Sequence, residues 1–166
     1  ALSLIRELAP VLGALMVTAR AGSAIAATIG SMRITEQIDA LEAMAVDPFQ
    51  YLVAPRIVAA LVTGPLLVAV FDLVGIGAGW AFAVHVLGLD GGTFMANIRD
   101  TVVWADVSAG LWKSVLFSGI LVWIAAYCGF HAERGARGIG VATTQAVVVT
   151  AILILAADYA ATALLF

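Results

Sequence analysis

The stretch from Ile57 to Leu89, IVAALVTGPLLVAVFDLVGIGAGWAFAVHVLGL, decides the fold of this 166-residue chain. Asp72 and His85 are its only titratable side chains. About 20 consecutive apolar residues suffice for a helix to cross a bilayer. This stretch therefore predicts a transmembrane helix, and Gly64-Pro65 predicts a kink inside it.

Three other segments are equally poor in charge. Residues 8–32 contain only Arg20, residues 114–130 contain no charge, and residues 138–166 contain only Asp158. None of them shows the alternation expected of a membrane β-strand. We therefore expect an all-α integral membrane protein with about four transmembrane helices, near residues 4–31, 53–85, 108–130 and 140–165.

The composition excludes other classes of protein. The chain is 63% hydrophobic and 11% charged, with a mean hydropathy of +1.09. Soluble domains carry about 25% charged residues. A net charge of −3 leaves no basic field for phosphates, so we expect no nucleic-acid partner.

The loops indicate an orientation. Adjacent loops lie on opposite sides of a membrane, so loops 32–52 and 131–139 share one side, and loop 86–107 occupies the other. Within loop 86–107, residues 93–99 predict a short interfacial helix capped by Thr93. Lys and Arg are enriched in cytoplasmic loops, which favours a cytoplasmic location for the first and third loops. Their positive residues are Arg33, Arg56, Arg134 and Arg137, against Arg99 and Lys113 in the middle loop region.

Small residues recur at every fourth position of the first predicted span. Such a stripe lets two helix backbones approach closely within a membrane. Packing within one subunit and a contact between two copies of the chain are both compatible with it. The residues are Ala14, Thr18, Gly22, Ala26 and Gly30.

Arg20 lies near the middle of the same span, where a charge costs at least about 2.5–3.5 kcal/mol. We expect it to face the bundle interior or a wet cavity. Asp72 and Asp158 are the acids inside other spans, so they are its expected partners. A structural ion pair and a polar substrate pathway are both possible roles.

Residues 34–45 predict an amphipathic helix in the first loop. Ile34, Ile38 and Leu41 keep helical spacing, while Glu36, Asp39 and Glu42 form a separate acidic stripe. A helix designed only to lie on anionic lipid is rich in Lys and Arg. The acidic stripe favours contact with a partner protein. The alternative is a re-entrant or packing helix with solvated acids.

The sequence lacks the motifs of common catalytic sites. It has no phosphate-binding G-x-x-x-x-G-K-[ST] motif, and its two histidines and one cysteine show no metal-ligand spacing. We therefore expect no catalytic residue, no bound metal and no cofactor held by this chain. The alternative function is a membrane-embedded enzyme, such as a lipid-modifying transferase or an intramembrane protease using Ser23 with His85 or His131.

Several spaced motifs resemble those of the MlaE/YrbE family. Members are permease subunits of ABC transporters that move phospholipids or other lipids together with Mce-domain proteins. Two positions depart from the family pattern, since Ala9 stands where glycine is frequent and Thr28 where an acid is frequent. The matching motifs are RELAP at 6–10, ARAGSAIAA at 19–27, MRITEQIDALE at 32–42, MAVDP at 44–48 and Pro55-Arg56.

The resemblance implies a domain organisation. Family chains have five transmembrane helices and a cytoplasmic coupling helix. We expect residues 1–166 to form a single transmembrane permease domain that corresponds to the C-terminal two-thirds of a family chain. On this view an interfacial helix and a first transmembrane helix precede it.

The resemblance also implies function and partners. We expect a non-enzymatic permease subunit, in a bacterial inner membrane, that moves phospholipid between inner and outer membranes while a partner hydrolyses ATP. The implied partners are a second copy of the chain, a cytoplasmic ABC ATPase dimer, an Mce-domain protein and a small STAS-type protein.

Two groups of residues receive roles by the same resemblance. Candidates for lining a lipid cavity are Arg6, Glu7, Arg20, Asp72 and Asp158. Candidates for coupling to the ATPase are Thr35, Glu36, Gln37, Ile38, Asp39, Leu41, Glu42 and Met44.

Overall fold

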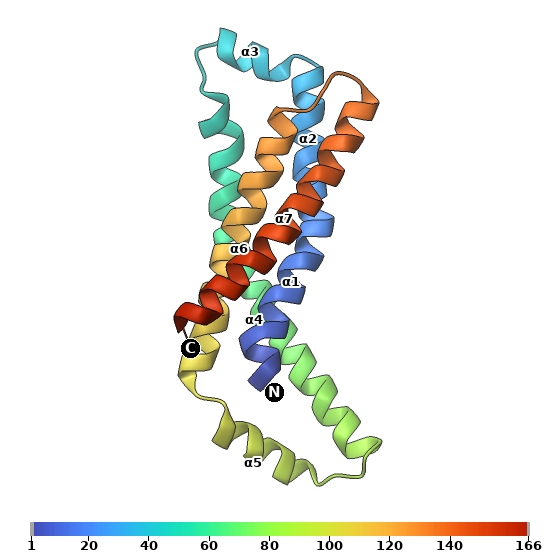
Figure 1. The fold of residues 1–166 in the computed structure, drawn as a ribbon, viewed down its shortest axis with the longest axis vertical. Helices are drawn as coiled ribbons and strands as arrows, with labels where there is room; N and C mark the ends of the chain where they lie inside the picture. The colour runs from blue at the N-terminus through green and yellow to red at the C-terminus, as the bar shows by residue number, and fades with distance from the viewer. Residues whose placement is uncertain (1, 166) are drawn as a thin grey trace.

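Four long helices dominate the computed structural model, which describes residues 2–165 (Figure 1). The first is continuous over Leu4–Ile34, with π-helical turns η1 (Leu4–Leu8) and η2 (Thr18–Gly22) and α-helical parts α1 (Ala9–Val17) and α2 (Ser23–Ile34). The second joins η3 (Phe49–Val53) to α4 (Ala54–His85). The others are α6 (Trp104–Phe130) and α7 (Ala136–Leu165), and two short helices, α3 (Gln37–Ala43) and α5 (Gly91–Thr101), complete the fold.

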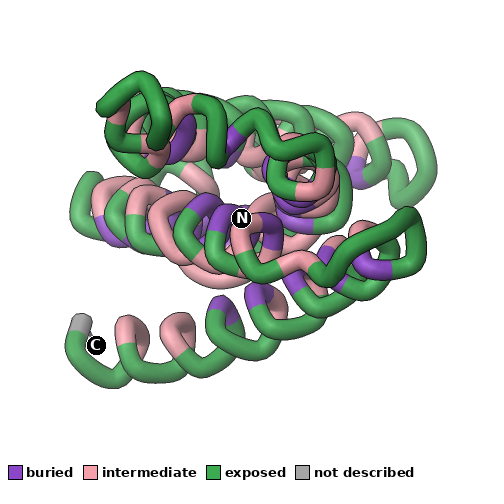
Figure 2. The backbone as a smooth tube through the Cα atoms, turned by 90° about the horizontal axis from the view of Figure 1, so that it is seen from above, coloured by how far each residue is buried: buried purple, intermediate pink, exposed green. Residues whose placement is uncertain are grey.

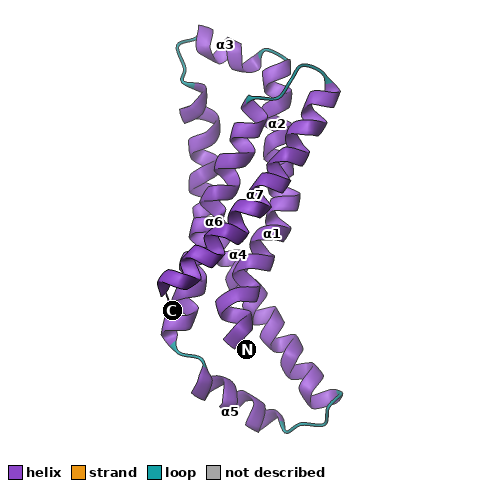
Figure 3. Ribbon diagram, in the orientation of Figure 1, coloured by secondary structure: helices purple, strands orange, loops and turns teal. Residues whose placement is uncertain are grey.

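The four long helices confirm the predicted all-α membrane fold. Each is long and apolar enough to cross a bilayer. Figure 3 shows helices joined by short loops, with no strand in the described part of the chain. Both ends of every predicted span lie within several residues of the observed ones.

The connections between spans lie at two opposite ends of the bundle. α3 and the α6–α7 loop lie together at one end, and α5 lies at the other (Figure 1). This is the arrangement predicted from the alternation of loops. Pro65 lies inside α4, whose C-terminal part runs away from the other spans toward α5 (Figure 1).

The centre of the bundle is α6, which contacts the first span, α4 and α7. Buried residues lie where the helices face one another, and exposed residues cover the outside (Figure 2). That outside is apolar, with exposed fractions of 74% for Leu73 and 71% for Trp112. An apolar exterior is expected of helices that contact lipid chains rather than water.

The stripe of small residues on the first span packs within the chain. Thr18, Gly22, Ala26 and Gly30 are buried, and a Cβ added at Gly22 would lie 3.8 Å from Leu121 Cγ of α6. The stripe therefore serves helix packing in one subunit, and its buried members are not available to a second copy.

A glycine of α6 provides the matching surface. A Cβ on Gly129 would lie 2.9 Å from the Ala26 carbonyl oxygen and 2.8 Å from Ile29 Cβ. Backbone and branched Cβ atoms cannot move aside as a flexible side-chain end can. The first span and α6 therefore approach as closely as their backbones allow.

Two loop details differ from the sequence predictions. α2 continues through Ile34, and the helical path is interrupted at Glu36, whose backbone is left-handed with a φ of +60°. The prediction of a single helix over residues 34–45 is therefore wrong, because the loop helix α3 covers only Gln37–Ala43. α5 begins at Gly91 rather than at the predicted Thr93 boundary. Its cap is Asp90, whose Oδ2 accepts the Thr93 N–H at 2.8 Å.

The close approach of the first span and α6 predicts the effect of a single methyl group. Gly129→Ala should destabilise the protein by about 1–3 kcal/mol, because overpacking forces the helices apart. Gly77→Ala is the matched control, since no atom lies within 4 Å of the added Cβ. Thermal unfolding in detergent measures both, and equal melting temperatures for the two variants would contradict the packing.

Candidate functional site

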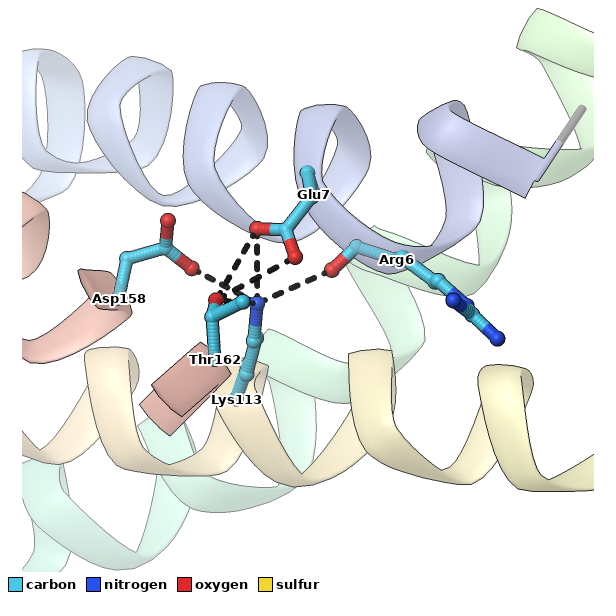
Figure 4. Close-up of polar contacts among 5 residues, drawn as sticks. All are labelled: Arg6, Glu7, Lys113, Asp158 and Thr162. Carbon is cyan, nitrogen blue, oxygen red and sulfur yellow. Dashed lines mark hydrogen bonds and ion pairs between the residues drawn. The ribbon is translucent and has the colours of Figure 1, made fainter. Parts of the chain in front are cut away.

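A buried lysine joins three of the four spans near the end that carries α5. Lys113 lies on α6, and its side chain is fully buried. Its Nζ lies 2.8 Å from Glu7 Oε2 on η1 and 3.0 Å from Asp158 Oδ1 on α7. Figure 4 shows these groups converging on the ammonium from both sides.

Neutral oxygens complete the surroundings of the ammonium. Lys113 Nζ donates to Thr162 Oγ1 at 2.8 Å and to the Arg6 carbonyl at 3.2 Å. Thr162 follows Asp158 by one helical turn, so both side chains leave the same face of α7. The lysine is thus held by two carboxylates and two uncharged acceptors, as a buried charge requires.

A second ion pair lies beside the first. Arg6 Nε donates to Asp106 Oδ1 at 2.7 Å, and the Asp106 side chain is 1% exposed. Asp106 Oδ2 also accepts the Val103 N–H at 3.1 Å, which caps the start of α6. Arg6 and Glu7, neighbours in sequence, therefore bind different parts of the same helix.

The structure unites three of the five residues predicted to line a lipid cavity. Arg6, Glu7 and Asp158 belong to one charged cluster, which we call the Lys113 cluster: Arg6, Glu7, Asp106, Lys113, Asp158 and Thr162. It holds two cations and three carboxylates within the bundle. Their role toward lipid stays a prediction.

Arg20 and Asp72 do not belong to the Lys113 cluster. Arg20 is exposed in the described chain, so it does not face the interior of this bundle, and its location in a wet cavity stays a prediction. The predicted pairing with Asp158 is also wrong, because Asp158 faces Lys113. Asp72 is partly buried on α4, and its Oδ1 has no hydrogen-bond partner among residues 2–165.

The residue pattern does not single out Lys113, Asp106 or Thr162 as site residues. The count of loop charges places Lys113 with the middle loop, although it falls inside the helix predicted over residues 108–130. That position is the available signal, since a lysine inside a membrane helix needs a partner. Which acids supply it depends on how three helices pack.

At the other end of the bundle, two apolar residues attach α3 to the spans. Ile38 is 1% exposed and belongs to a core cluster with Ile29, Leu52, Val53 and Ala126. Leu41 packs against the same cluster. These two coupling candidates therefore anchor α3 to its own chain, and Ile38 is not available to a partner.

The remaining coupling candidates are accessible. Asp39 forms an ion pair with Arg33, with Oδ1 and Nη1 2.7 Å apart, and both side chains are about half exposed. Met44 is 65% exposed, so its apolar side chain is available to a partner. The exposed candidates are Thr35, Glu36, Gln37, Asp39, Glu42 and Met44.

The proposed catalytic groups of the alternative enzyme do not meet. Ser23 Oγ donates to the Ala19 carbonyl at 2.6 Å, within its own helix. His85 Nδ1 lies 3.0 Å from the Ala81 carbonyl near α5, while His131 Nδ1 lies 2.9 Å from the Tyr127 carbonyl near α3. Among the described residues no cluster of three or more His, Cys, Asp or Glu side chains suits a metal ion.

Comparison with known proteins identifies relatives along the whole chain. Residues 1–164 match the family described as Permease MlaE. The intermembrane phospholipid transport system permease protein MlaE of Haemophilus influenzae is 41% identical over the full chain, which covers 64% of that protein. A probable ABC transporter permease of Rickettsia typhi is 42% identical over 99% of this chain and 64% of its own length.

A more distant relative comes from a plant. TRIGALACTOSYLDIACYLGLYCEROL 1, a chloroplastic protein of Arabidopsis thaliana, is 32% identical over the full chain and 47% of its own length. The chain thus spans 64% of the length of these two bacterial relatives and 47% of the length of the plant protein.

The Lys113 cluster predicts a specific pattern of stability. Lys113→Met should destabilise the protein by about 3–5 kcal/mol, because it leaves two facing carboxylates without their cation. Combining it with Glu7→Gln and Asp158→Asn removes those charges and should restore most of the loss. Arg99→Met, on the exposed surface of α5, is the control.

Thermal unfolding in detergent measures these variants. A melting temperature of Lys113→Met equal to that of the native protein would contradict the cluster. So would a triple variant no more stable than the single one.

Proposed function

Since the chain belongs to the MlaE permease family, we propose that it is the membrane-spanning part of an ABC transporter that moves phospholipid between membranes. The observation that carries this proposal is the exposed acidic face of α3, held on the bundle by buried Ile38. A short helix anchored in this way suits transmission of a force from a partner to the spans.

The proposed partner at α3 is an ATPase. The chain has no nucleotide-binding motif of its own, so ATP hydrolysis belongs to a separate protein. An ATPase dimer would contact α3 from each of two permease copies. The closing and opening of that dimer would shift α3 as a rigid lever and bias the spans between two arrangements.

The proposed lipid route passes the Lys113 cluster. This cluster places charged and hydrogen-bonding groups inside an otherwise apolar bundle, at the end opposite α3. Charged groups within a membrane commonly mark a substrate path. Glu7 is the cluster's most accessible carboxylate, with 37% of its side chain exposed. Glu7 is therefore the group best placed to meet a lipid headgroup.

The remaining partners follow from the family. We propose a second copy of the chain, with the lipid cavity between the two, and an Mce-domain protein at the α5 end. A small STAS-type protein would bind the ATPase side. The location would be a bacterial inner membrane, with no cofactor bound by this chain.

Charge reversal on α3 tests the proposed coupling. The triple variant Glu36→Lys, Asp39→Lys, Glu42→Lys should lose its partner ATPase, because the complementary surface would now meet like charge. Co-purification of the ATPase with the tagged permease measures this loss, and the amount of permease in membranes checks insertion. We expect normal insertion and at least about a tenfold loss of bound ATPase.

Two single variants control for added charge. Glu133→Lys changes an exposed acid at the same end but outside α3, and Asp100→Lys changes one on α5. Both should retain the ATPase. Full binding and ATP turnover by the triple variant would refute the coupling role of α3.

A further inference from the structure

We propose that a groove along α6, starting beside α3, binds a phospholipid whose headgroup carries an ammonium group. The groove joins a polar cavity to an apolar channel, and Trp123 lines both. This site lies at the opposite end of the bundle from the Lys113 cluster. It rests on the proposed function only in that the ligand is a phospholipid.

The polar cavity has a volume of about 500 Å³ and is formed by three parts of the chain. Arg33 comes from the end of α2, Glu42 from α3, and Asp47 from the connection to η3. These residues lie at the ends of spans, at the depth where phospholipid headgroups meet water. The cavity therefore presents one cation and two carboxylates at headgroup level.

These charges complement a zwitterion. The guanidinium of Arg33 has five N–H donors, and Asp39 takes one of them, so others remain for a phosphate. Asp47 Oδ1 accepts the Phe49 N–H at 2.9 Å, which leaves Oδ2 for a ligand. Glu42 is exposed and lines the cavity. Two available carboxylates favour an ammonium group over an uncharged glycerol headgroup.

Aromatic rings complete the ammonium site. Trp123 and Tyr127 lie one turn apart on α6 and line the cavity. The ring of Phe49 meets Trp123 edge to face, with centroids 5.8 Å apart, which holds the indole in place. The face of Trp attracts organic cations, whereas the Tyr127 ring packs against His131, with centroids 4.3 Å apart, so Trp123 is the ring proposed to meet the ammonium group.

The apolar channel is an open groove on the outer surface of the bundle, which suits an acyl chain lying along the helices. Its volume is about 520 Å³, and it runs from Trp123 along α6 past Ile120 and Leu116, between Leu61 of α4 and Leu153 of α7. Leu116 and Tyr127 are about 16 Å apart along the helix axis, roughly half the thickness of a bilayer core. Polar cavity and channel together match the headgroup and one acyl chain of a phospholipid in one leaflet.

The test measures which lipids the purified permease retains, using native mass spectrometry. Phosphatidylethanolamine and phosphatidylglycerol are the probes, supplied in equal amounts. The native protein should retain more phosphatidylethanolamine. The double variant Glu42→Gln, Asp47→Asn should lose that preference by about tenfold or more, since it removes charge-assisted contacts to the ammonium. Because Glu42 is also a coupling candidate, Asp47→Asn alone should change the preference in the same direction. Asp47→Asn keeps the oxygen that accepts the Phe49 N–H.

A second variant tests the channel independently of the headgroup. Gly119→Leu fills the channel and should reduce retention of both lipids. Glu133→Gln and Gly77→Leu are the matched controls, because neither residue lines the cavity or the channel. Both controls should bind lipid like the native protein.

Two outcomes overturn the inference. One is equal retention of both probes by the native protein, and the other is an unchanged preference in the double variant. Either can occur while the reconstituted transporter still moves phospholipid, in which case the proposed function stands. Conversely, binding with the expected preference but without any transport would refute the proposed function and keep the site.

Discussion

The charge of Lys113 constrains how the spans can be arranged. An ammonium group with no exposed surface must be surrounded by acceptors, and its four partners come from the first span and α7. Removing the first span or α7 from this arrangement leaves the buried charge of Lys113 incompletely satisfied. The cluster therefore specifies which helices are neighbours and at what depth, a specificity that apolar packing between similar helices cannot supply.

The first span links the two ends of the molecule. It carries Glu7 of the Lys113 cluster near its start, and it ends at Ile34, directly before the turn into α3. Two π-helical turns interrupt its regular hydrogen bonding, at Leu4–Leu8 and at Thr18–Gly22. Such turns are frequent at functional sites. The first span therefore connects α3 directly to one of the two carboxylates that hold Lys113.

The parts of the fold that depend on local sequence were predictable. Span positions follow from hydropathy, and the place of α3 follows from the spacing of Ile38 and Leu41. The Lys113 cluster was not predictable in full, because pairing across three helices depends on their rotation about their own axes. Depth along a helix suggested that Arg20 meets Asp158, yet Arg20 is exposed in the described chain. The position of a charged residue along its helix does not identify its partner unless the rotation of that helix about its axis is also known.

The structure also changes the basis of the predicted orientation. Lys113 is not a loop charge, because it is buried between Glu7 and Asp158. Arg6 is a positive residue at the same end that the prediction did not include, since the first span begins there. The balance of four positive residues to two is therefore preserved, although one of its members has changed. Arg6 and Arg99 at the α5 end stand against Arg33, Arg56, Arg134 and Arg137 at the other end, so the distribution of Lys and Arg still predicts that α3 lies on the cytoplasmic side.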